Sequence, residues 1–526
     1  MTKFVKFIAG KICNIMLFSD KIRALREASN ITQSTMAKAL CISVPMYSRI
    51  EKGERSVKRE QILRIAKVLD TDADNLRKLW LADQVAAVLD GEGDVFNDVV
   101  NIAKKDCTKQ KKHQDKYSFI DLFAGCGGLS EGFLQTGRFD ALAHVEWEFP
   151  MVETLRNRLV QKWNRTSEQA KKEVVCFDIQ KTDELLNGNW SEDSKEKYSQ
   201  YNAPSIVNGG LNSLIRERPV DLIIGGPPCQ AYSIHGRATD KNSMKDDYRN
   251  YLFESFCKVV DAYRPQVFVF ENVKGLLSAR PGGVYVKERI FSAFDRIGYD
   301  IVLPSKMSSI VFDANDYNVP QVRPRVIILG VKRGTGLQLS ELYESIGAQK
   351  CGYHPTVRDG IGKLPPLYPL KEVIKDGRSI ISHSACPIPS ITLHESRHHS
   401  ERDKRVFREW INNDMNHVSH QKMIDFYYKI TGHRTLFQKY KNLEWDKPSH
   451  TIVAHLSKDG YMFIHPDVKQ ERSITVREAA CLQSFPIDYQ FLGSRPYNYK
   501  MIGNAVPVEF AKRIALGLCN ILDKRL

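Results

Sequence analysis

The sequence predicts an α/β fold, a doubly wound and mostly parallel sheet, joined to a smaller domain and preceded by an all-α domain. Three observations carry this prediction. Short apolar runs alternate with amphipathic helical patterns from residue 117 onward. Several of these runs end in an acidic residue or in glycine, as expected where the carboxyl ends of parallel strands meet at one edge. Residues 19–70, in contrast, show only helical periodicity.

The composition favours a polyanionic partner. The 526 residues include 77 lysines and arginines against 62 acidic residues, a formal net charge of +15. This excess suits DNA, RNA or a membrane surface. No apolar run approaches the length of a membrane span, so we expect no membrane partner. The 11 cysteines include no CxxC pair, which argues against a zinc site or a disulfide framework and indicates a cytosolic chain.

Residues 1–95 are expected to form a helical domain. Four short amphipathic patterns fall between residues 19 and 70. Thr32 and Ser43 are placed to cap the second and third of these helices, because their side-chain oxygens can accept from free backbone N–H groups. Since the helical pattern begins just after Met16, that residue stays open as an alternative translation start.

One stretch of this domain, Gln33–Gly53, resembles the helix-turn-helix of the Cro/Xre-like phage repressor family. The resemblance implies that the third helix, which contains Val44–Arg49, enters the major groove of DNA. Its first turn carries Val44 and Pro45 where polar residues are usual, so a module used for protein contacts stays open as the alternative. Residues 96–116 are expected to be a basic linker that can contact phosphates.

The next region begins with a strand and a glycine-rich turn. The apolar run 119–123 is followed by Ala124–Ser130 and a helical pattern, an arrangement that leaves backbone N–H groups facing a ligand. Ser130 occupies the last position of a G-x-G-x-x-G pattern, which disfavours a dinucleotide. The second run ends in Glu146-Trp147, suited to a ribose diol and a base, and the third ends in Asp178-Ile179.

A second turn presents a thiol at the predicted edge of the sheet. The apolar run 220–224 leads into Gly225–Gln230, where two glycines allow a tight turn and two prolines stiffen it around Cys229. The polar residues 183–216 before it are expected to form an inserted loop. Glu271 ends the next apolar run and adds a carboxylate to this edge. Three side chains that point one way along a later extended stretch are Gln321, Arg323 and Arg325.

Residues 117–526 resemble the C5-cytosine DNA methyltransferase family. The resemblance rests on six motifs that occur in the family's order, a combination that chance does not assemble. They are Asp121-Leu-Phe-Ala-Gly-Cys-Gly-Gly-Leu-Ser130, Gly226-Pro-Pro-Cys-Gln230, Glu271-Asn-Val273, Gln321-x-Arg323-x-Arg325, Arg477-Glu-Ala-Ala-Cys-Leu-Gln-Ser-Phe-Pro486 and Gly503-Asn-Ala-Val-Pro507.

The resemblance implies a Rossmann-like catalytic domain that uses S-adenosyl-L-methionine, formed by residues 117–331 and 472–526. Residues 332–471 would be the smaller target-recognition domain, whose histidines and arginines suit base edges and phosphates. No histidine spacing there is typical of a metal site, so we expect no metal.

The resemblance also implies the chemistry. Cys229 would add to C6 of a flipped cytosine, which makes C5 able to attack a sulfonium methyl group. Glu271 would hydrogen-bond the exocyclic amine and N3 of the base. Arg323 and Arg325 would steady the nucleophile loop and the flipped base, with Gln321 nearby.

The residues implied around the cofactor contact its adenine, ribose and methionine parts. Glu146 would hold the ribose, and two aromatic side chains would flank the adenine. For the aromatic and aliphatic members of the set, plain core packing stays open as the alternative. The full set is Phe123, Gly125, Gly127, Glu146, Trp147, Asp178, Ile179, Leu252, Asn504 and Val506.

The resemblance implies a bacterial DNA (cytosine-5-)-methyltransferase, cytoplasmic and nucleoid-associated, that modifies double-stranded DNA in a restriction–modification system. The cognate endonuclease would act on the same site without needing to bind this chain. Residues 19–70 would bind the chain's own operator, and the protein would be a monomer or a helix-turn-helix dimer. A transcription regulator with a relic enzyme domain and an RNA C5-cytosine methyltransferase stay open as rival hypotheses.

Overall fold

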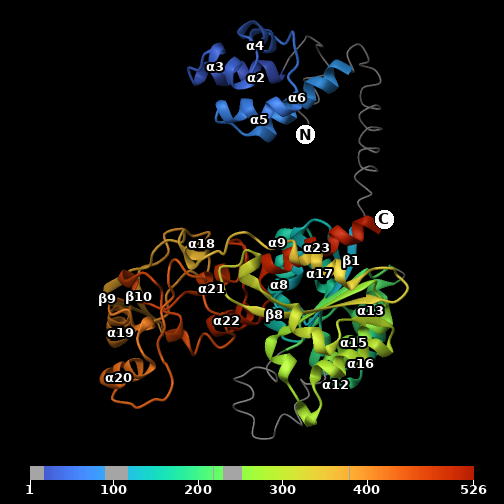
Figure 1. The fold of residues 1–526 in the computed structure, drawn as a ribbon, viewed down its shortest axis with the longest axis vertical. Helices are drawn as coiled ribbons and strands as arrows, with labels where there is room; N and C mark the ends of the chain where they lie inside the picture. Colours follow the sequence, from blue (N-terminus) through green and yellow to red (C-terminus); the bar gives the residue numbers. More distant parts are fainter. Residues whose placement is uncertain (1–16, 89–115, 217, 229–251, 378, 526) are drawn as a thin grey trace. The chain divides into compact units, whose positions relative to one another are not determined.

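The computed structural model describes residues 17–88, 116–216, 218–228, 252–377 and 379–525. The chain divides into two compact units, Met1–Gln114 and Asp115–Leu526 (Figure 1). Within the described ranges, no helix has the length and apolar character that crossing a membrane requires. The same ranges bring together no group of three histidine, cysteine or acidic side chains that could hold a metal ion.

The first unit packs short helices around one small core. Thr32 and Ser43 cap the second and third of the predicted helices, since their side chains accept hydrogen bonds from the backbone N–H groups of Thr35 and Met46. Tyr47, on the third helix, is fully buried among the apolar faces of the others. The helices are α2 (Leu17–Ala28), α3 (Gln33–Leu40), α4 (Val44–Glu51), α5 (Arg59–Val68) and α6 (Ala73–Val88).

The second unit is built on an eight-stranded sheet in the order β3-β2-β1-β4-β5-β8-β6, with β7 also paired to β8. The first five strands of the chain run parallel to one another, whereas β8 runs antiparallel to its neighbours β5, β6 and β7. The strands are β1 (Tyr117–Leu122), β2 (Phe139–Glu146), β3 (Val174–Cys176), β4 (Leu222–Gly225), β5 (Val267–Val273), β6 (Tyr299–Ile301), β7 (Val311–Asp313) and β8 (Pro324–Lys332).

Helices cover both faces of this sheet, because its central strands carry apolar side chains on both sides. Phe119 and Ile120, neighbours in β1, belong to the two different cores. The predicted doubly wound, mostly parallel sheet is therefore confirmed (Figure 1). One face carries α8 (Gly128–Gln135), α9 (Phe149–Trp163), α10 (Ser167–Glu173), α17 (Leu339–Gly347) and α23 (Val508–Leu522); the other carries α11 (Thr182–Asn187), α13 (Pro204–Ile215), α15 (Leu252–Tyr263) and α16 (Val286–Arg296).

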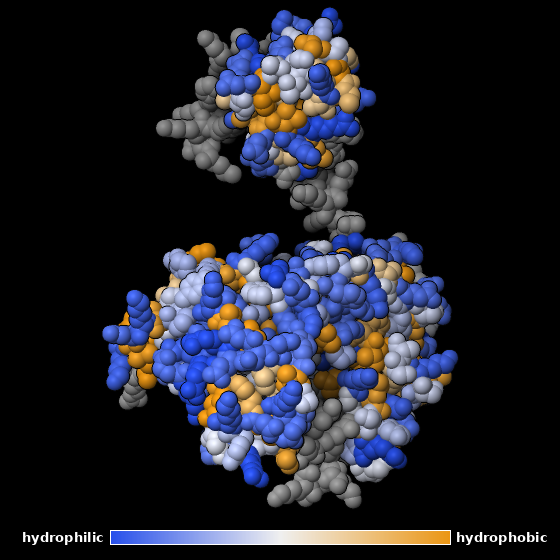
Figure 2. All heavy atoms as spheres, turned by 60° about the vertical axis from the view of Figure 1, so that its left-hand side comes forward, coloured by the Kyte–Doolittle hydropathy of each residue, from blue (hydrophilic) through white to orange (hydrophobic). Residues whose placement is uncertain are grey.

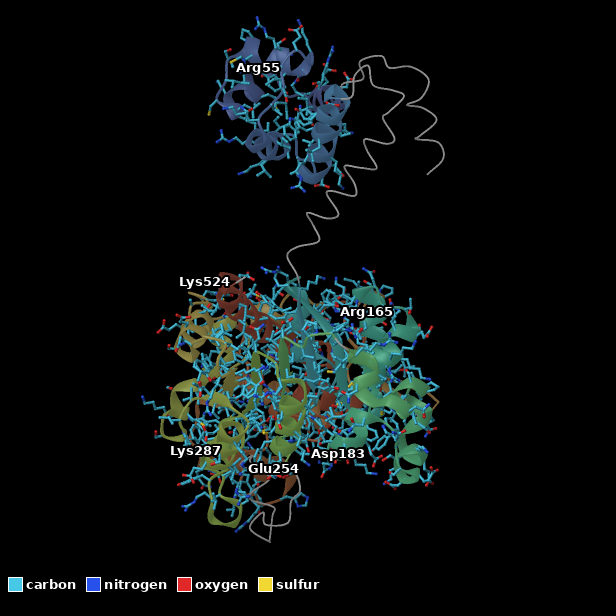
Figure 3. The ribbon with its side chains drawn as sticks, turned by 90° about the vertical axis from the view of Figure 1, so that its right-hand side faces the viewer. Arg55, Arg165, Asp183, Glu254, Lys287 and Lys524 are labelled. Carbon is cyan, nitrogen blue, oxygen red and sulfur yellow. The ribbon has the colours of Figure 1, made fainter. Side chains whose placement is uncertain are left out.

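The carboxyl ends of the parallel strands define the edge where a ligand site is expected. In Figure 3, labelled side chains mark this edge and the opposite edge of the sheet. Asp183, Glu254 and Lys287, from the first turns of helices that follow β3, β4 and β5, lie at one end of the unit. Arg165 and Lys524, which follow the ends of α9 and α23, lie at the other.

The polar stretch 183–216 is not the inserted loop that its composition predicts. It folds into α11, α12 (Glu192–Tyr198) and α13. Trp190 between α11 and α12 is buried and stacks on Phe177, with ring centroids 4.3 Å apart. Gly188 and Gly210 let the backbones meet, because a Cβ on Gly210 would lie 2.5 Å from the Gly188 nitrogen. Apolar side chains spaced along this polar segment, among them Leu185, Ile206 and Leu211, therefore pack into the core and order it.

A smaller part of the second unit follows β8 in the chain. Its own core contains Val406, Phe407, Trp410, Tyr440 and Ile464. Helix α17 lies in the same stretch of sequence but packs with α23 in the core of the sheet. The elements of the smaller part are β9 (Pro369–Asp376), β10 (Ser379–His383), α19 (Glu401–Asn412) and α20 (His420–Thr431). Helix α18 (Val357–Ile361) packs on α21 (Val476–Leu482), and α21 and α22 (Arg495–Asn504) precede α23.

Candidate active site

A cavity of about 290 Å³ opens at the carboxyl edge of the sheet. Its walls come from the turns after the parallel strands and from the end of α22. Nine of the ten residues that the sequence assigns to the cofactor line it, together with Glu271, Arg323 and Arg325. The nine are Phe123, Gly125, Glu146, Trp147, Asp178, Ile179, Leu252, Asn504 and Val506.

Glu146, at the end of β2, is fixed by backbone hydrogen bonds. One carboxylate oxygen accepts from the Gly125 N–H at 2.9 Å, and the other accepts from the N–H groups of Trp147 and Glu148, each at 2.9 Å. The Gly125 backbone has a φ of +56°, a conformation that glycine adopts readily. Burial raises the pKa of Glu146 to about 7. The turns after β1 and β2 thus form one rigid wall that presents a carboxyl group with a readily changed charge.

The aromatic and aliphatic residues of the set differ in exposure. Trp147 is 47 % exposed and so is not a core residue. Ile179 and Leu252 are buried members of one core of the sheet and also line the cavity. Asp178 accepts a hydrogen bond from the Gln180 N–H at 3.0 Å, which orders the turn after β3.

Gly127 is the member of the set that does not line the cavity. It precedes α8 with a φ of +86°, and a Cβ there would lie 2.5 Å from a methyl group of Leu155. Its neighbour Gly128 does line the cavity and approaches the backbone of Val506, whose carbonyl oxygen would lie 2.5 Å from an added Cβ. Glycine is therefore needed at Gly127 for the positive φ of the turn, and at Gly128 for the close approach of the Val506 backbone.

The thiol turn enters the cavity wall after β4. Gly226, Pro227 and Pro228 line the cavity, whereas Cys229 lies outside the described residues. The Asn272 side chain donates to the Pro227 carbonyl at 3.2 Å and so ties the turn to the end of β5. A Cβ at Gly226 would lie 2.7 Å from a carboxylate oxygen of Glu271. Glycine is needed at this position for the turn and the Glu271 side chain to lie this close.

Glu271 and Arg325 form an ion pair in the wall. Arg325 Nε lies 2.8 Å from Glu271 Oε1, and both side chains are only 11 % exposed. The pair follows from the sheet, because β5 and β8 are antiparallel neighbours with Val273 opposite Arg325. Arg325 also donates to the Pro324 carbonyl at 2.8 Å, which fixes its guanidinium. The carboxylate of Glu271 is thereby held in one orientation at the cavity.

Arg323 has different partners from Arg325. It is buried and donates to backbone carbonyls of Ile452, Gly503 and Ala505 at 2.8, 2.7 and 3.1 Å. It therefore anchors the segment that carries Asn504 to the strand β8.

Gln321 is fully buried and does not contribute to the described cavity lining. Its amide nitrogen donates to the Leu482 carbonyl at 3.1 Å, and its oxygen accepts from the Ile452 N–H at 2.9 Å. The structure thus brings Arg323 and Arg325 to the cavity. Gln321 lies outside the cavity lining and links the backbones at Leu482 and Ile452.

Sequence reasoning did not single out three other residues of the cavity wall. Asp121, the last residue but one of β1, is buried, and burial raises its pKa to about 8. Lys500 of α22 lies 2.9 and 2.6 Å from the two carboxylate oxygens of Glu148, which also accepts from the Tyr497 hydroxyl. The available signal was an acid inside an apolar run for Asp121, and nearness to the predicted cofactor residue Trp147 and to Gly503 of the last motif for the ion pair.

Comparisons with known proteins agree with this geometry. A model of the C-5 cytosine-specific DNA methylase family matches residues 117–519, and a helix-turn-helix model matches residues 22–76. The type II methyltransferase M.Bpa9945I of Bacillus paralicheniformis is 34 % identical over 451 residues, which cover 77 % of this chain and 99 % of that protein. The type II methyltransferase M1.HphI of Haemophilus parahaemolyticus is 30 % identical, covering 76 % and 85 %. The type II methyltransferase M.Sau96I of Staphylococcus aureus is 25 % identical and covers 96 % and 98 %.

Proposed function

Because the chain belongs to the C-5 cytosine-specific DNA methylase family and is a DNA cytosine methyltransferase, we propose that it methylates C5 of a cytosine flipped out of a specific duplex sequence, with S-adenosyl-L-methionine as cofactor. The observation that carries this proposal is the Glu271–Arg325 pair, which shares one cavity with Glu146 and Trp147. A group that can support a developing negative charge on a base thus lies beside groups that suit a nucleoside.

The residues of the cavity fit the cofactor. An exposed indole, a carboxylate and a wall with no side chain at Gly125 suit an adenine, a ribose and a close backbone approach. When bound, the cofactor supplies an electrophilic methyl group. Asp178 and Asn504 add polar groups at the rim, and Ile179, Leu252 and Val506 add apolar contacts.

The protein's own groups carry the remaining chemistry. Cys229 adds as a thiolate to C6 of the cytosine, which makes C5 nucleophilic. Glu271 hydrogen-bonds N3 and the exocyclic amine, while Arg325 holds its carboxylate in place. After methylation, loss of the C5 proton to water expels Cys229. Arg323 keeps the segment around Asn504 against the site.

The division of the second unit supports a separate recognition domain within residues 332–471. The core around Trp410 belongs to this part alone, whereas α17 packs with the sheet. We place the reader of the target sequence in the smaller part and the chemistry in residues 117–331 and 472–526.

Bisulfite sequencing of DNA from cells that express this chain tests the proposal. We expect protected cytosines at one sequence context, and none with Cys229→Ser. Protein that binds the cofactor but leaves all duplex DNA unmethylated would refute it. Methyl transfer to tRNA but not to duplex DNA would favour the RNA hypothesis, and unchanged biological effects of Cys229→Ser would favour a regulator with a relic enzyme domain.

A second function is favoured by the helix-turn-helix match at residues 22–76. We infer that this domain, as a monomer or dimer, binds the chain's own operator and represses transcription of a restriction–modification system. Helix α4 leaves Val44 and Arg49 exposed at its surface. DNase footprinting of the upstream DNA should show protection that is lost when residues 1–95 are deleted; an identical footprint after deletion would exclude this function. The setting that we propose is the bacterial cytoplasm at the nucleoid, with a cognate endonuclease that acts on the same site without binding this chain.

A further inference from the structure

Lys500 and Glu148 form an ion pair in the wall of the active-site cavity. Figure 2 shows that hydrophilic residues cover most of one face of the second unit, so an exposed ion pair alone would carry no argument. This pair differs, because both residues line the cavity and the Glu148 side chain is only 20 % exposed. The Lys500 ammonium group donates to both carboxylate oxygens, at 2.9 and 2.6 Å, and the Tyr497 hydroxyl donates to one of them. Two groups of α22 therefore hold this carboxylate.

The fold explains why these residues meet. Glu148 lies in the turn after β2, directly before α9. Tyr497 and Lys500 are three residues apart on α22 and so share one face of that helix. The same helix ends at Asn504. The ion pair therefore joins the wall that carries Trp147 to the wall that carries Asn504.

Glu148 also acts on the carboxyl group of Glu146, two residues before it in the chain. The Glu148 N–H donates to a carboxylate oxygen of Glu146 at 2.9 Å, which keeps the two residues close. Burial chiefly, and the negative charge of Glu148 in addition, raise the pKa of Glu146 to about 7, against backbone hydrogen bonds that lower it. A cation paired with Glu148 offsets its charge. Lys500 is that cation.

Four other titratable groups face Glu146 from the elements around it. They are Asp121 of β1, Cys126 of the turn after β1, Cys176 of β3 and Tyr497 of α22. Burial raises the pKa of all four, so each is largely uncharged near neutral pH. The charge that acts on Glu146 at this pH is thus chiefly that of Glu148, and Lys500 determines how much of it is offset.

Resting on the use of S-adenosyl-L-methionine proposed above, we propose that Lys500 is a positioning residue for the cofactor, which holds Glu148 in the cavity wall and offsets its charge so that Glu146 accepts from the ribose as a carboxylate. Lys500 acts through Glu148 and Glu146 and not by contact with the reacting atoms. Without the ammonium group, the charge of Glu148 opposes ionisation of Glu146, and the neutral carboxyl group binds the diol more weakly. Removal of both charges cancels the two effects.

The test measures the affinity of the full chain for S-adenosyl-L-methionine by isothermal titration calorimetry between about pH 6 and 9. In Lys500→Met, the midpoint of the pH dependence should rise by about 0.5 to 1 unit. The affinity should then fall about two- to fivefold at neutral pH and recover at the alkaline end. Glu148→Gln should lower the midpoint, and the Lys500→Met/Glu148→Gln double variant should return it close to the wild-type value.

Two further variants are controls. Lys500→Arg keeps the cation and should keep the wild-type pH profile. Arg495→Met removes a cation that is 40 % exposed on the same helix and should leave the profile unchanged. Thermal denaturation shows whether each variant is folded. If Lys500→Met does not fold, Glu148→Gln decides, because it removes the other charge of the same pair.

The assignment is wrong if Lys500→Met keeps the wild-type midpoint and affinity. It is also wrong if this variant loses the same factor of affinity at every pH, because the ion pair then acts only through the shape of the wall. Either result leaves the use of the cofactor intact. A wild-type chain that binds no S-adenosyl-L-methionine at any pH refutes both proposals.

Discussion

The wall of the active-site cavity and the end of the smaller part around α20 use their side chains in opposite ways. In the wall, Glu146 and Arg323 are buried and bonded to backbone groups, and the buried Glu271 is paired with Arg325. Around α20, Leu436 and Phe437 are exposed and no helix residue is completely buried. The difference teaches that chemistry and folding share the same residues in the wall, whereas the exposed side chains at the α20 end can vary without disturbing the core.

The largest effect should follow from Glu271→Gln, which keeps the shape of the wall and removes the carboxylate. We expect kcat to fall about 100- to 1000-fold, because the group that supports charge on the base is weakened, while cofactor affinity stays unchanged. Single-turnover methylation of a target duplex measures this. Glu192→Gln, at a 91 % exposed side chain, is the control. Equal losses of cofactor affinity and kcat would mean that Glu271 acts through the shape of the wall.

The next largest effect is expected from Arg323→Met, which tests whether Arg323 stabilises the fold by anchoring the backbone around Asn504. The change leaves the carbonyls of Ile452, Gly503 and Ala505 without their donor. We expect the free energy of unfolding to fall by about 3 kcal/mol, since buried polar groups lose their partners. Urea denaturation measures the change. Arg333→Met, at a surface arginine that is 49 % exposed, should change it by less than about 1 kcal/mol. Equal effects for both variants would contradict the anchoring role.

The pH dependence of cofactor binding tests whether the buried carboxyl group of Glu146 in the cavity wall contacts the cofactor. Burial raises its pKa to about 7, so the carboxyl group changes from mostly protonated to mostly ionised across neutral pH. A ribose hydroxyl donates to the ionised form, and binding should therefore strengthen as pH rises. We expect roughly a tenfold gain in cofactor affinity between about pH 6 and 8. Isothermal titration calorimetry of the wild type and Glu146→Gln measures it.

In Glu146→Gln, the cofactor affinity should no longer change between about pH 6 and 8. If Glu146→Gln keeps the same pH dependence, another group in the wall is responsible, and Asp121, whose pKa burial raises to about 8, becomes the candidate.

The smallest effect is expected at the α20 end. Tyr428→Ala should leave the free energy of unfolding within about 0.5 kcal/mol, because the side chain is half exposed and packs little. Trp410→Ala in the neighbouring core should cost about 3 to 5 kcal/mol. Thermal denaturation of both variants provides the comparison. A large loss at Tyr428 would show that α20 is part of the core and would remove the contrast between the two regions.

Sequence patterns were sufficient for most of the fold and cavity, since strand periodicity and the order of motifs determine the sheet edge. They were not sufficient for residues 183–216, because a few contacts such as Trp190 on Phe177 order a polar segment. Spacing also does not distinguish Arg323 from Arg325, which alternate along one extended stretch but have different partners. The same limit applies to Gly127, since a glycine needed for packing and one needed for a ligand look alike in sequence.

The hydrogen bonds from Arg323 to Gly503 and Ala505 form only after the end of the chain has been synthesised, so the cavity is completed late. Every strand of the sheet is synthesised before residue 333, yet part of the cavity wall comes from residues beyond 500. The helix that covers α8 is also synthesised last, because Gly132 of α8 packs directly against Val508 and Ala511 of α23. A growing chain on the ribosome therefore displays a complete sheet with an open site, and the cavity closes only after the final helices emerge. We expect nascent chains to lack methyltransferase activity during that interval, because part of the cavity wall is missing, and to expose apolar faces that the final helices later cover.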